Sequence, residues 1–275
     1  MIRRILVGLG GTPFSETATG RAIELAKAHG AQLSAATLFD PSTLDVGALY
    51  PSSVTRAATE LREEQIRALE IGLEQAMDHF GAACRREKIP FRIHWESVDP
   101  FDQVVSMARY HDLFVCGLRG LFEYGIASDP EASLVRLIRH GVHPTLAVSK
   151  SHEEIRRVLI AYSGSVDSAR ALKTYLQSSL WPEAEICLAC FDDKAARRER
   201  LTADARAYCE AHGRHPAVHH ADAPPDEGIL AQADAWNADL IVMGDGAHNV
   251  IARKVLGDTL LEVVRQADRP LLLTH

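Results

Sequence analysis

The chain contains an internal repeat, and this feature constrains its fold more than any other. Residues 5–12 (ILVGLGGT) return as residues 158–165 (VLIAYSGS), 153 positions later. Residues 112–117 (DLFVCG) return as residues 239–244 (DLIVMG), 127 positions later. The fall in offset from 153 to 127 means that the first half carries 26 extra residues between its second and fourth strands. Such self-similarity predicts two copies of one structural unit in a single chain.

Each half alternates short apolar runs with longer amphipathic stretches. A continuous apolar run is typical of a strand that is covered on both faces, as in a parallel sheet. The runs predict ten strands, at residues 3–9, 32–38, 91–96, 112–116, 144–148, 156–162, 184–190, 216–220, 238–243 and 270–274. Strands that alternate with helices form parallel sheets with right-handed crossovers. We therefore expect two tandem, doubly wound α/β domains, each with a five-stranded parallel sheet.

Two helices of the first half can be placed from the sequence. One is expected from about residue 15 to residue 29, because Gly30 stands at the usual C-terminal capping position. The other is expected over residues 54–87, where apolar residues recur at intervals of three and four and predict one buried face. The residues of this stripe are Ile66, Leu69, Leu73, Ala76, Phe80 and Ala83.

The repeat also predicts the domain boundaries. The first domain should cover residues 1–149 and the second residues 155–275, and most of the extra residues of the first domain lie near residues 41–61. The last strand of each half is short and apolar and follows a proline. An edge strand of this kind is exposed to pairing unless something covers it. We expect the two domains to cover each other's edges and to pack as a pseudo-dimer.

Composition excludes several classes of protein. Apolar residues make up 47% of the 275 residues and charged residues 24%, which is typical of a globular protein with a full core. No apolar stretch approaches the roughly 20 residues of a membrane span, and the apolar run at residues 5–7 is too short for a signal peptide. The net charge of −7 and the lack of long basic runs argue against nucleic-acid binding. We expect a cytoplasmic protein with no membrane or nucleic-acid partner.

The cysteines and histidines do not form a recognisable metal or redox motif. Cys187 and Cys190 have the spacing Cys-x-x-Cys but lie in a predicted strand, where side chains three positions apart point to opposite faces. We interpret them as small core residues, and Cys116 in the same way, although Cys116 lies near the expected cleft and a redox role there is the alternative. The histidines, among them His143 and the adjacent pair at 219–220, lack zinc-site spacing and are expected at the surface.

The carboxyl ends of the strands are the expected place for a ligand in an open parallel sheet. In the second half the first strand ends near Tyr162 and Ser163, and the fourth ends at Met243 and Gly244. The loop at residues 244–259 contains several glycines and leads into an apolar helix. Glycines let the backbone approach a phosphate, and free N–H groups at a helix start bind anions. This edge is the candidate ligand site.

The arrangement resembles the universal stress protein family. The resemblance rests on the alternation of elements, on first strands that end in Gly-Thr (residues 11–12) or Gly-Ser (residues 164–165), and on the ending strand–glycine loop–helix–Pro–strand. It covers nearly the whole chain, twice, and implies a Rossmann-like fold of the adenine nucleotide alpha hydrolase type. Nucleotide-binding members carry Gly-x2-Gly-x9-Gly-Ser/Thr after strand four, where it holds ATP phosphates. They commonly have an Asp before the Gly-Ser of strand one, where this chain has Gly10 and Ser163.

The second half departs from the family's glycine motif. Gly244 and Gly257 are 13 positions apart, as the motif requires. Ala247, however, replaces the middle glycine, and Gly246 lies one position early. Asp258 stands where a hydroxyl would donate to a phosphate. The second half therefore retains the outer glycines of the motif but not its middle glycine or its hydroxyl.

The first half departs further. Gly117 and Gly120 match the opening of the motif, but Pro130 occupies the third glycine position and Glu131 the hydroxyl position. The resemblance therefore implies ATP binding in the second half more than in the first. Gly117 and Gly120 are the first half's candidate contacts.

The role of Asp258 has two readings. A carboxylate about 4 Å from a phosphate charge is repulsive by ~1 kcal/mol in water and by several times that where water is excluded. In one reading Asp258 caps the following helix. In the other Thr259, Lys254 or His248 supplies phosphate contacts, or a bridging cation makes Asp258 a ligand.

The resemblance implies a stress-response protein that binds a ligand and regulates, rather than an enzyme. No nucleophile has a base and an orienting acid at recognisable spacing, although slow ATP hydrolysis stays an open alternative. The ligand would be ATP, another adenine nucleotide or a different small molecule, and a protein partner or a homodimer is also compatible.

Two other functions compete. One is a protein of the same fold that binds no nucleotide, which the altered glycine motifs favour. The other is an adenylating enzyme of the ATP pyrophosphatase type, because residues 163–168 (SGSVDS) resemble the Ser-Gly-Gly-x-Asp-Ser loop of those enzymes. Against this reading, Ser165 replaces a glycine of that loop, and Asp167 and Ser168 are ordinary residues at a helix start.

Overall fold

A computed structural model describes residues 2–39, 55–95, 100–127, 129–139, 143–191, 195–245 and 258–274. The first half contains β1 (Arg4–Leu9), α1 (Phe14–His29), β2 (Gln32–Thr37), α2 (Thr55–Arg86), β3 (Phe91–His94), α3 (Pro100–Ala108), β4 (Leu113–Cys116), α4 (Gly120–Glu123), α5 (Pro130–Arg139) and β5 (Thr145–Ala147). The second half contains β6 (Arg157–Ala161), α6 (Val166–Ser178), β7 (Glu185–Phe191), α7 (Ala195–Ala211), β8 (Ala217–Ala221), α8 (Pro225–Ala235), β9 (Leu240–Gly244), α9 (Asp258–Gln266) and β10 (Leu271–Thr274). All ten predicted strands are confirmed, with ends shifted by at most two residues.

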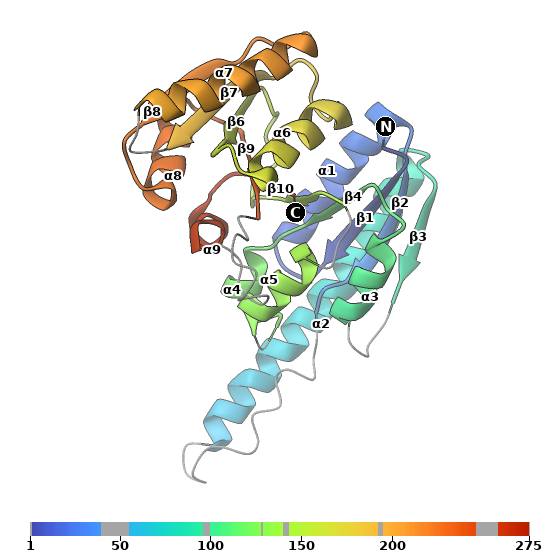
Figure 1. Cartoon of the computed structure of the whole chain (residues 1–275). Coiled ribbons are helices and arrows are strands. Elements are labelled where there is room, and N and C mark those ends of the chain that lie inside the picture. The colour runs from blue at the N-terminus through green and yellow to red at the C-terminus, as the bar shows by residue number, and fades with distance from the viewer. Residues whose placement is uncertain are drawn as a thin grey trace.

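One ten-stranded sheet runs through both halves, in the order β3-β2-β1-β4-β5-β10-β9-β6-β7-β8 (Figure 1). Neighbouring strands within each half are parallel, as predicted for crossover connections. The two halves meet where β5 and β10 pair antiparallel, with Leu146 opposite Leu272. Each half thus covers the other's edge strand, and the expected pseudo-dimer is confirmed.

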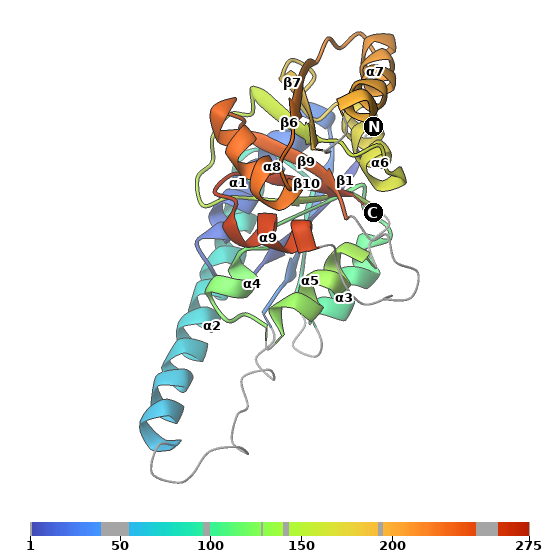
Figure 2. The same cartoon turned by 60° about the vertical axis from the view of Figure 1, so that its left-hand side comes forward.

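Helices cover both faces of the sheet (Figures 1 and 2). In the first half α1 packs with α2, and α3 packs with α5. In the second half α6 packs with α7, and α8 packs with α9. This is the doubly wound arrangement that the alternation of strands and helices predicts.

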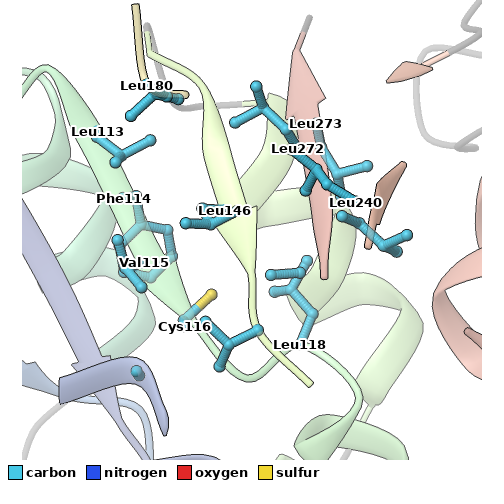
Figure 3. Close-up of a cluster of buried hydrophobic side chains, with 14 of the residues drawn as sticks. Leu113, Phe114, Val115, Cys116, Leu118, Leu146, Leu180, Leu240, Leu272 and Leu273 are labelled. Atoms are coloured by element: carbon cyan, nitrogen blue, oxygen red, sulfur yellow. The ribbon is translucent and has the colours of Figure 1, made fainter. Parts of the chain in front are cut away.

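The apolar core is continuous across the junction of the two halves. Figure 3 shows Leu146 between the side chains of β4 and those of Leu272 and Leu273 on β10. Leu146 and Leu272 are fully buried, and Leu273 is 1% exposed. Burial of a leucine contributes roughly 1.5–3 kcal/mol, so these side chains stabilise the junction as they would a single-domain core.

Both predicted helices of the first half are confirmed. α1 ends at His29, and Gly30 follows in the left-handed conformation with φ of 64°. In α2 the buried side chains include Leu73, Phe80 and Ala83 of the predicted stripe. α2 has 32 residues, against 17 in α7 at the same position of the second half. Its N-terminal part extends away from the rest of the described chain (Figure 1).

Part of the predicted insertion at residues 41–61 belongs to this long helix. Residues 55–61 form the first turns of α2, and residues 41–54 lie outside the described residues. The extra length of the first half is therefore partly helical.

The cysteine interpretation is confirmed, whereas the histidine expectation is wrong for two side chains. Cys187 and Cys190 are buried on β7 as free thiols, and burial raises the pKa of Cys187 to about 11. His143, expected at the surface, is 5% exposed, and His111 is 7% exposed. His111 compensates for its burial with ring contacts to Met107 O at 2.8 Å and Ser34 Oγ at 3.0 Å. Neighbouring elements bury these rings, which local spacing does not show.

The described ranges contain neither a cluster of metal-ligating side chains nor a helix suited to span a membrane. No three His, Cys, Asp or Glu side chains there gather into a metal site. None of the helices described combines the length and the apolar character that a membrane span requires.

A carboxylate performs the same structural task in each half. Asp112 Oδ2 accepts the backbone N–H groups of Arg3 and Arg4 at 2.7 and 2.9 Å. Asp239 Oδ2 accepts those of Arg156 and Arg157, both at 2.8 Å. The two aspartates come just before the fourth strand of their halves, and each fastens the start of the first strand beside it.

Replacing Asp239 by alanine is expected to lower the free energy of unfolding by about 1–3 kcal/mol, because two hydrogen bonds to a charged acceptor are lost. Asp112→Ala should have a similar effect on the first half. Urea denaturation measures both. Glu63→Ala is the control, because Glu63 forms only a 3.8 Å surface ion pair with Arg67 and should cost no more than about 0.5 kcal/mol. Equal stability of Asp239→Ala and Glu63→Ala would contradict the expectation.

Candidate functional site

A cavity of about 220 Å³ opens at the carboxyl ends of β6 and β9 in the second half. Its apolar wall is formed by Ala161, Phe191, Pro225, Ile229, Met243 and Leu260. Its polar groups come from Tyr162, Ser163, Ser165, Asp167, Ser168, Gly244, Asp245 and Thr259. An apolar hollow with a few convergent polar groups is the usual form of a small-molecule site.

Three serine hydroxyls line one side of the cavity. Ser163 Oγ donates to Ser165 Oγ at 3.0 Å, and Ser165 Oγ lies 3.2 Å from Ser168 Oγ. Ser165 is also the N-cap of α6, where its Oγ accepts the backbone N–H of Ser168 at 3.1 Å. The cap explains why the chain turns into a helix directly after β6. It also confirms that Ser168 belongs to a helix start, the ordinary reading of residues 163–168.

Two glycines let the backbone come close enough to form this corner. Gly164 has φ of +73°, and a Cβ there would lie 2.3 Å from Leu201 Cδ2 on α7. A Cβ on Gly244 would lie 2.6 Å from the carbonyl carbon of Asp167. The end of β9 and the first turn of α6 therefore pack backbone to backbone, and a larger residue at position 244 would separate them.

The charge of the cavity is negative at the described residues. Asp245 is 6% exposed, and the Asp167 side chain is 15% exposed and pairs with Arg170 at 3.7 Å. Among the described lining residues there is no lysine, arginine or histidine. Burial raises the pKa of Tyr162, so this phenol stays neutral and can donate a hydrogen bond. These groups suit hydroxyl or amino groups of a ligand better than an unaccompanied phosphate.

The predicted site residues of the second half are only partly described. Tyr162, Ser163, Met243, Gly244 and Thr259 line the cavity. Asp258 is exposed and begins α9, where a negative charge interacts favourably with the helix dipole. Gly246, Ala247 and Gly257 lie outside the described residues. Contact of any of these residues with a nucleotide stays a prediction.

In the first half, side chains fill the place that corresponds to the cavity of the second half. Phe14 stands at the position equivalent to Asp167, and it is 2% exposed. A Cβ on Gly117, the equivalent of Gly244, would lie 2.2 Å from Phe14 Cβ, and one on Gly120 would lie 3.4 Å from Phe14 Cδ2. A Cβ on Gly10, the equivalent of Ser163, would lie 3.0 Å from Ile126 Cδ1. Gly117 and Gly120 thus accommodate an aromatic ring of the chain itself.

The backbone of α2 packs directly against the end of β1 in the first half. Gly11, the equivalent of Gly164, has φ of +67°, and a Cβ there would lie 2.4 Å from Leu69 O of α2. A Cβ on Gly72 would lie 2.5 Å from Gly11 O. In the second half the corresponding neighbour of Gly164 is a leucine side chain, so the two clefts differ in how closely the covering helix approaches.

Sequence reasoning did not assign several lining residues that the fold brings to the cavity, among them Phe191, Pro225, Ile229 and Leu260. These come from β7, α8 and α9, and no local motif marks them. Ser165, Asp167 and Ser168 were weighed only as a rival loop, although their position directly after β6 was the available signal. Asp245 directly follows Gly244, so it could have been included from its place in the chain.

Comparison with known proteins identifies the family. The sequence model of the universal stress protein family matches residues 1–138 and 189–275. The chain belongs to the universal stress protein family. Its segment at residues 139–188, which includes β6 and α6, lies outside the match. That segment also includes Ser163, Ser165 and Ser168 of the cavity lining.

Individual relatives agree with this assignment. Universal stress protein Slr1230 of Synechocystis sp. (strain ATCC 27184 / PCC 6803 / Kazusa) is 25% identical over 163 residues, which is 58% of this chain. The chain spans 57% of the length of that curated relative. A universal stress protein from Archaeoglobus fulgidus DSM 4304 has a TM-score of 0.67 at 16% identity, over 98% of this chain and 95% of its own. A functionally unknown protein from Pseudomonas aeruginosa PAO1 has a TM-score of 0.61 at 16% identity, over 99% and 92%. These structures show that the two-halved fold is shared over its full length.

Proposed function

We propose that this universal stress protein binds one adenine nucleotide, in the cavity of its second half, and acts in regulation rather than catalysis. The observation that carries the proposal is the contrast between the two halves. The second half has a 220 Å³ cavity at the carboxyl ends of β6 and β9, whereas Phe14 occupies the equivalent position in the first half. A ligand site at this edge is the rule for open parallel sheets.

The described groups support contacts to the nucleoside part of the ligand. The serine hydroxyls and the two carboxylates can bond ribose hydroxyls or an amino group, and the apolar wall suits a planar base. Phosphates would be held by the glycine-containing segment at residues 246–257, which lies outside the described residues, or by a divalent cation that bridges them to Asp167 or Asp245. Carboxylates and a cation are compatible partners for phosphate oxygens.

The lining chemistry supports binding without catalysis. Ser163, Ser165 and Ser168 bond to one another, and the described lining residues include no histidine or lysine. Of the two carboxylates on the lining, Asp167 pairs with Arg170 at 3.7 Å. The cytoplasm stays the predicted location of the protein. A protein partner or a homodimer stays the predicted route of signalling.

Titration calorimetry with ATP and Mg²⁺ is expected to give one binding site per chain, with weaker binding when Mg²⁺ is removed. Ser163→Phe should abolish the heat, because the ring would occupy the cavity. Tyr110→Ala should leave it unchanged, because Tyr110 is 72% exposed, lies between α3 and β4 of the first half and does not line the cavity. The same samples are assayed for released phosphate, and turnover that Ser163→Phe removes would contradict the non-catalytic part of the proposal.

A second candidate is a ligand without phosphate. The two carboxylates and the absence of a cation among the described lining residues favour a neutral or amino-bearing molecule. Adenosine titrated in parallel separates the two functions. Binding of adenosine without binding of ATP would favour this second candidate, and two ATP sites per chain would overturn the proposal that the first half is closed.

A further inference from the structure

A second cavity lies at the junction of the two halves. It has a volume of about 240 Å³ and lies beside the carboxyl end of β5 and the start of β10. Because β5 and β10 are antiparallel, this is the ligand edge of the first half and the opposite edge from the cleft of the second half. Its apolar surface comes from both halves, from Phe14, Leu118, Val148, Val264 and Leu271.

Three cationic side chains border this junction cavity: Arg119, Lys150 and Arg269. Arg119 Nη1 donates to Ala267 O at 3.0 Å, so this side chain reaches from the first half into the second. Lys150 Nζ lies 5.6 Å and 5.5 Å from the ring centroids of Phe14 and Tyr124. The one carboxylate on the lining, Asp268, is held by Arg269 Nε at 2.8 Å. Arg269 also pairs with Asp234, so its charge is balanced, whereas Arg119 and Lys150 share a single carboxylate, that of Glu123.

Two of these cations, Arg119 and Lys150, bind the carboxylate of Glu123. Its Oε2 lies 2.8 Å from Lys150 Nζ, and its Oε1 lies 2.5 Å from Arg119 Nε. Glu123 is the last residue of α4 and is not part of the cavity lining, and its side chain is 24% exposed. Lys150 and Arg119 thus hold a carboxylate beside a largely apolar cavity, and that carboxylate belongs to a side chain that is partly exposed to water.

We propose that the junction cavity binds a small organic anion, with its apolar body inside the cavity and its carboxylate in place of Glu123 on Lys150 and Arg119. Phe14 links this site to the loss of the first cleft, because the same ring that fills the space beside Gly117 forms a wall of the junction cavity. The site uses both halves, so its ligand would act at their junction. It is separate from the nucleotide cleft and does not depend on it.

Calorimetry of the full chain with 2-naphthoate tests the proposal, with the uncharged 2-naphthamide as the matched probe. Naphthoate is expected to bind at one site per chain and more tightly than naphthamide. Glu123→Gln should tighten naphthoate binding about threefold to fivefold, because the neutral amide competes less well for the two cations. Lys150→Met should weaken it by a similar factor and leave naphthamide unchanged.

Lys173→Met is the control variant, because Lys173 Nζ lies 5.4 Å from the ring centroid of Tyr208, a similar cation–aromatic contact away from the cavity. It should leave naphthoate binding unchanged. Equal binding of the two probes, no binding to Glu123→Gln, or equal losses in Lys150→Met and Lys173→Met would overturn the proposal. The proposal requires tighter naphthoate binding in Glu123→Gln, which a folding defect cannot produce. A loss of binding in Lys150→Met that came from misfolding therefore could not support the proposal by itself.

Discussion

Gly11→Ala is expected to lower the free energy of unfolding by about 3–5 kcal/mol, which is exceptional for the addition of one methyl group. Gly11 has φ of +67°, a conformation that costs an alanine roughly 1–2 kcal/mol. The new Cβ would also lie 2.4 Å from Leu69 O and 2.7 Å from Leu73 N. Both atoms belong to the backbone of α2, so a side-chain rotation cannot relieve the contact. The helix would have to move and give up part of the burial of Leu73 and Phe80.

The matched control for Gly11→Ala is Gly125→Ala. Gly125 has φ of +62° in the same half of the chain, but nothing lies within 4 Å of the Cβ that alanine would add. It should therefore cost only the backbone strain, about 1–2 kcal/mol. Urea denaturation followed by circular dichroism measures both variants. If the two variants lose the same stability, the close approach of α2 to Gly11 contributes nothing, and the account of the closed first cleft fails.

Arg21→Ala is expected to cost about 3 kcal/mol, because it removes a buried side chain that packs between the two halves and leaves the Glu153 carbonyl without its donor. The Arg21 side chain is 2% exposed. Its Nη1 lies 2.5 Å from Glu24 Oε2, and its Nη2 donates to the backbone carbonyl of Glu153 in the joint between the domains. Its guanidinium carbon lies 5.8 Å from the ring centroid of Trp181 in the second half. Burial lowers the pKa of Arg21, and the neighbouring Glu24 acts in the opposite direction.

Several groups would lose their partner in this variant. The Glu153 carbonyl would lose its donor, and among the described residues Glu24 would keep His152 at 3.0 Å and Trp181 Nε1 at 3.4 Å. A cavity would also remain where the arginine stem had packed. Arg21→Met, which retains most of the packing, should lose less stability than Arg21→Ala.

Arg67→Ala is the control for a surface arginine. The Arg67 side chain is 69% exposed and pairs with Glu63 at 3.8 Å, so its loss should change stability by no more than about 0.5 kcal/mol. The measurement is urea denaturation, monitored by tryptophan fluorescence and by circular dichroism. A loss below 1 kcal/mol in Arg21→Ala would show that the buried arginine contributes little to the junction.

Local signals explain why the fold could be predicted. The strands are continuous apolar runs, and all ten appear within two residues of their expected ends. Gly30 follows the last residue of α1 with φ of 64°, and glycine adopts this left-handed conformation more easily than other residues. The pseudo-dimer could be anticipated because a short apolar edge strand needs a partner, and β5 and β10 supply each other with one. These features depend on the properties of short segments.

The candidate site was only partly predictable. Tyr162, Ser163, Met243 and Gly244 follow from the rule that ligands lie at strand ends, and they do line the cavity. Phe191, Pro225 and Ile229 reach it from elements far apart in the sequence. The burial of His143 was missed for the same reason. Its ring lies 6.4 Å from the ring of Phe114, measured between centroids, and Phe114 belongs to β4.

The sequence alone determined the repeat and the order of its strands and helices, because periodicity and capping are properties of neighbouring residues. Its motifs also carried the resemblance to the family that the family model shows. Only the tertiary structure decided which half keeps a cavity. Phe14 and Asp167 hold equivalent places in the repeat, yet Phe14 is buried against Gly117, whereas Asp167 lines an open cleft beside Gly244. The difference arises because a buried aromatic ring gains free energy by filling apolar space, whereas a carboxylate loses free energy when it leaves water.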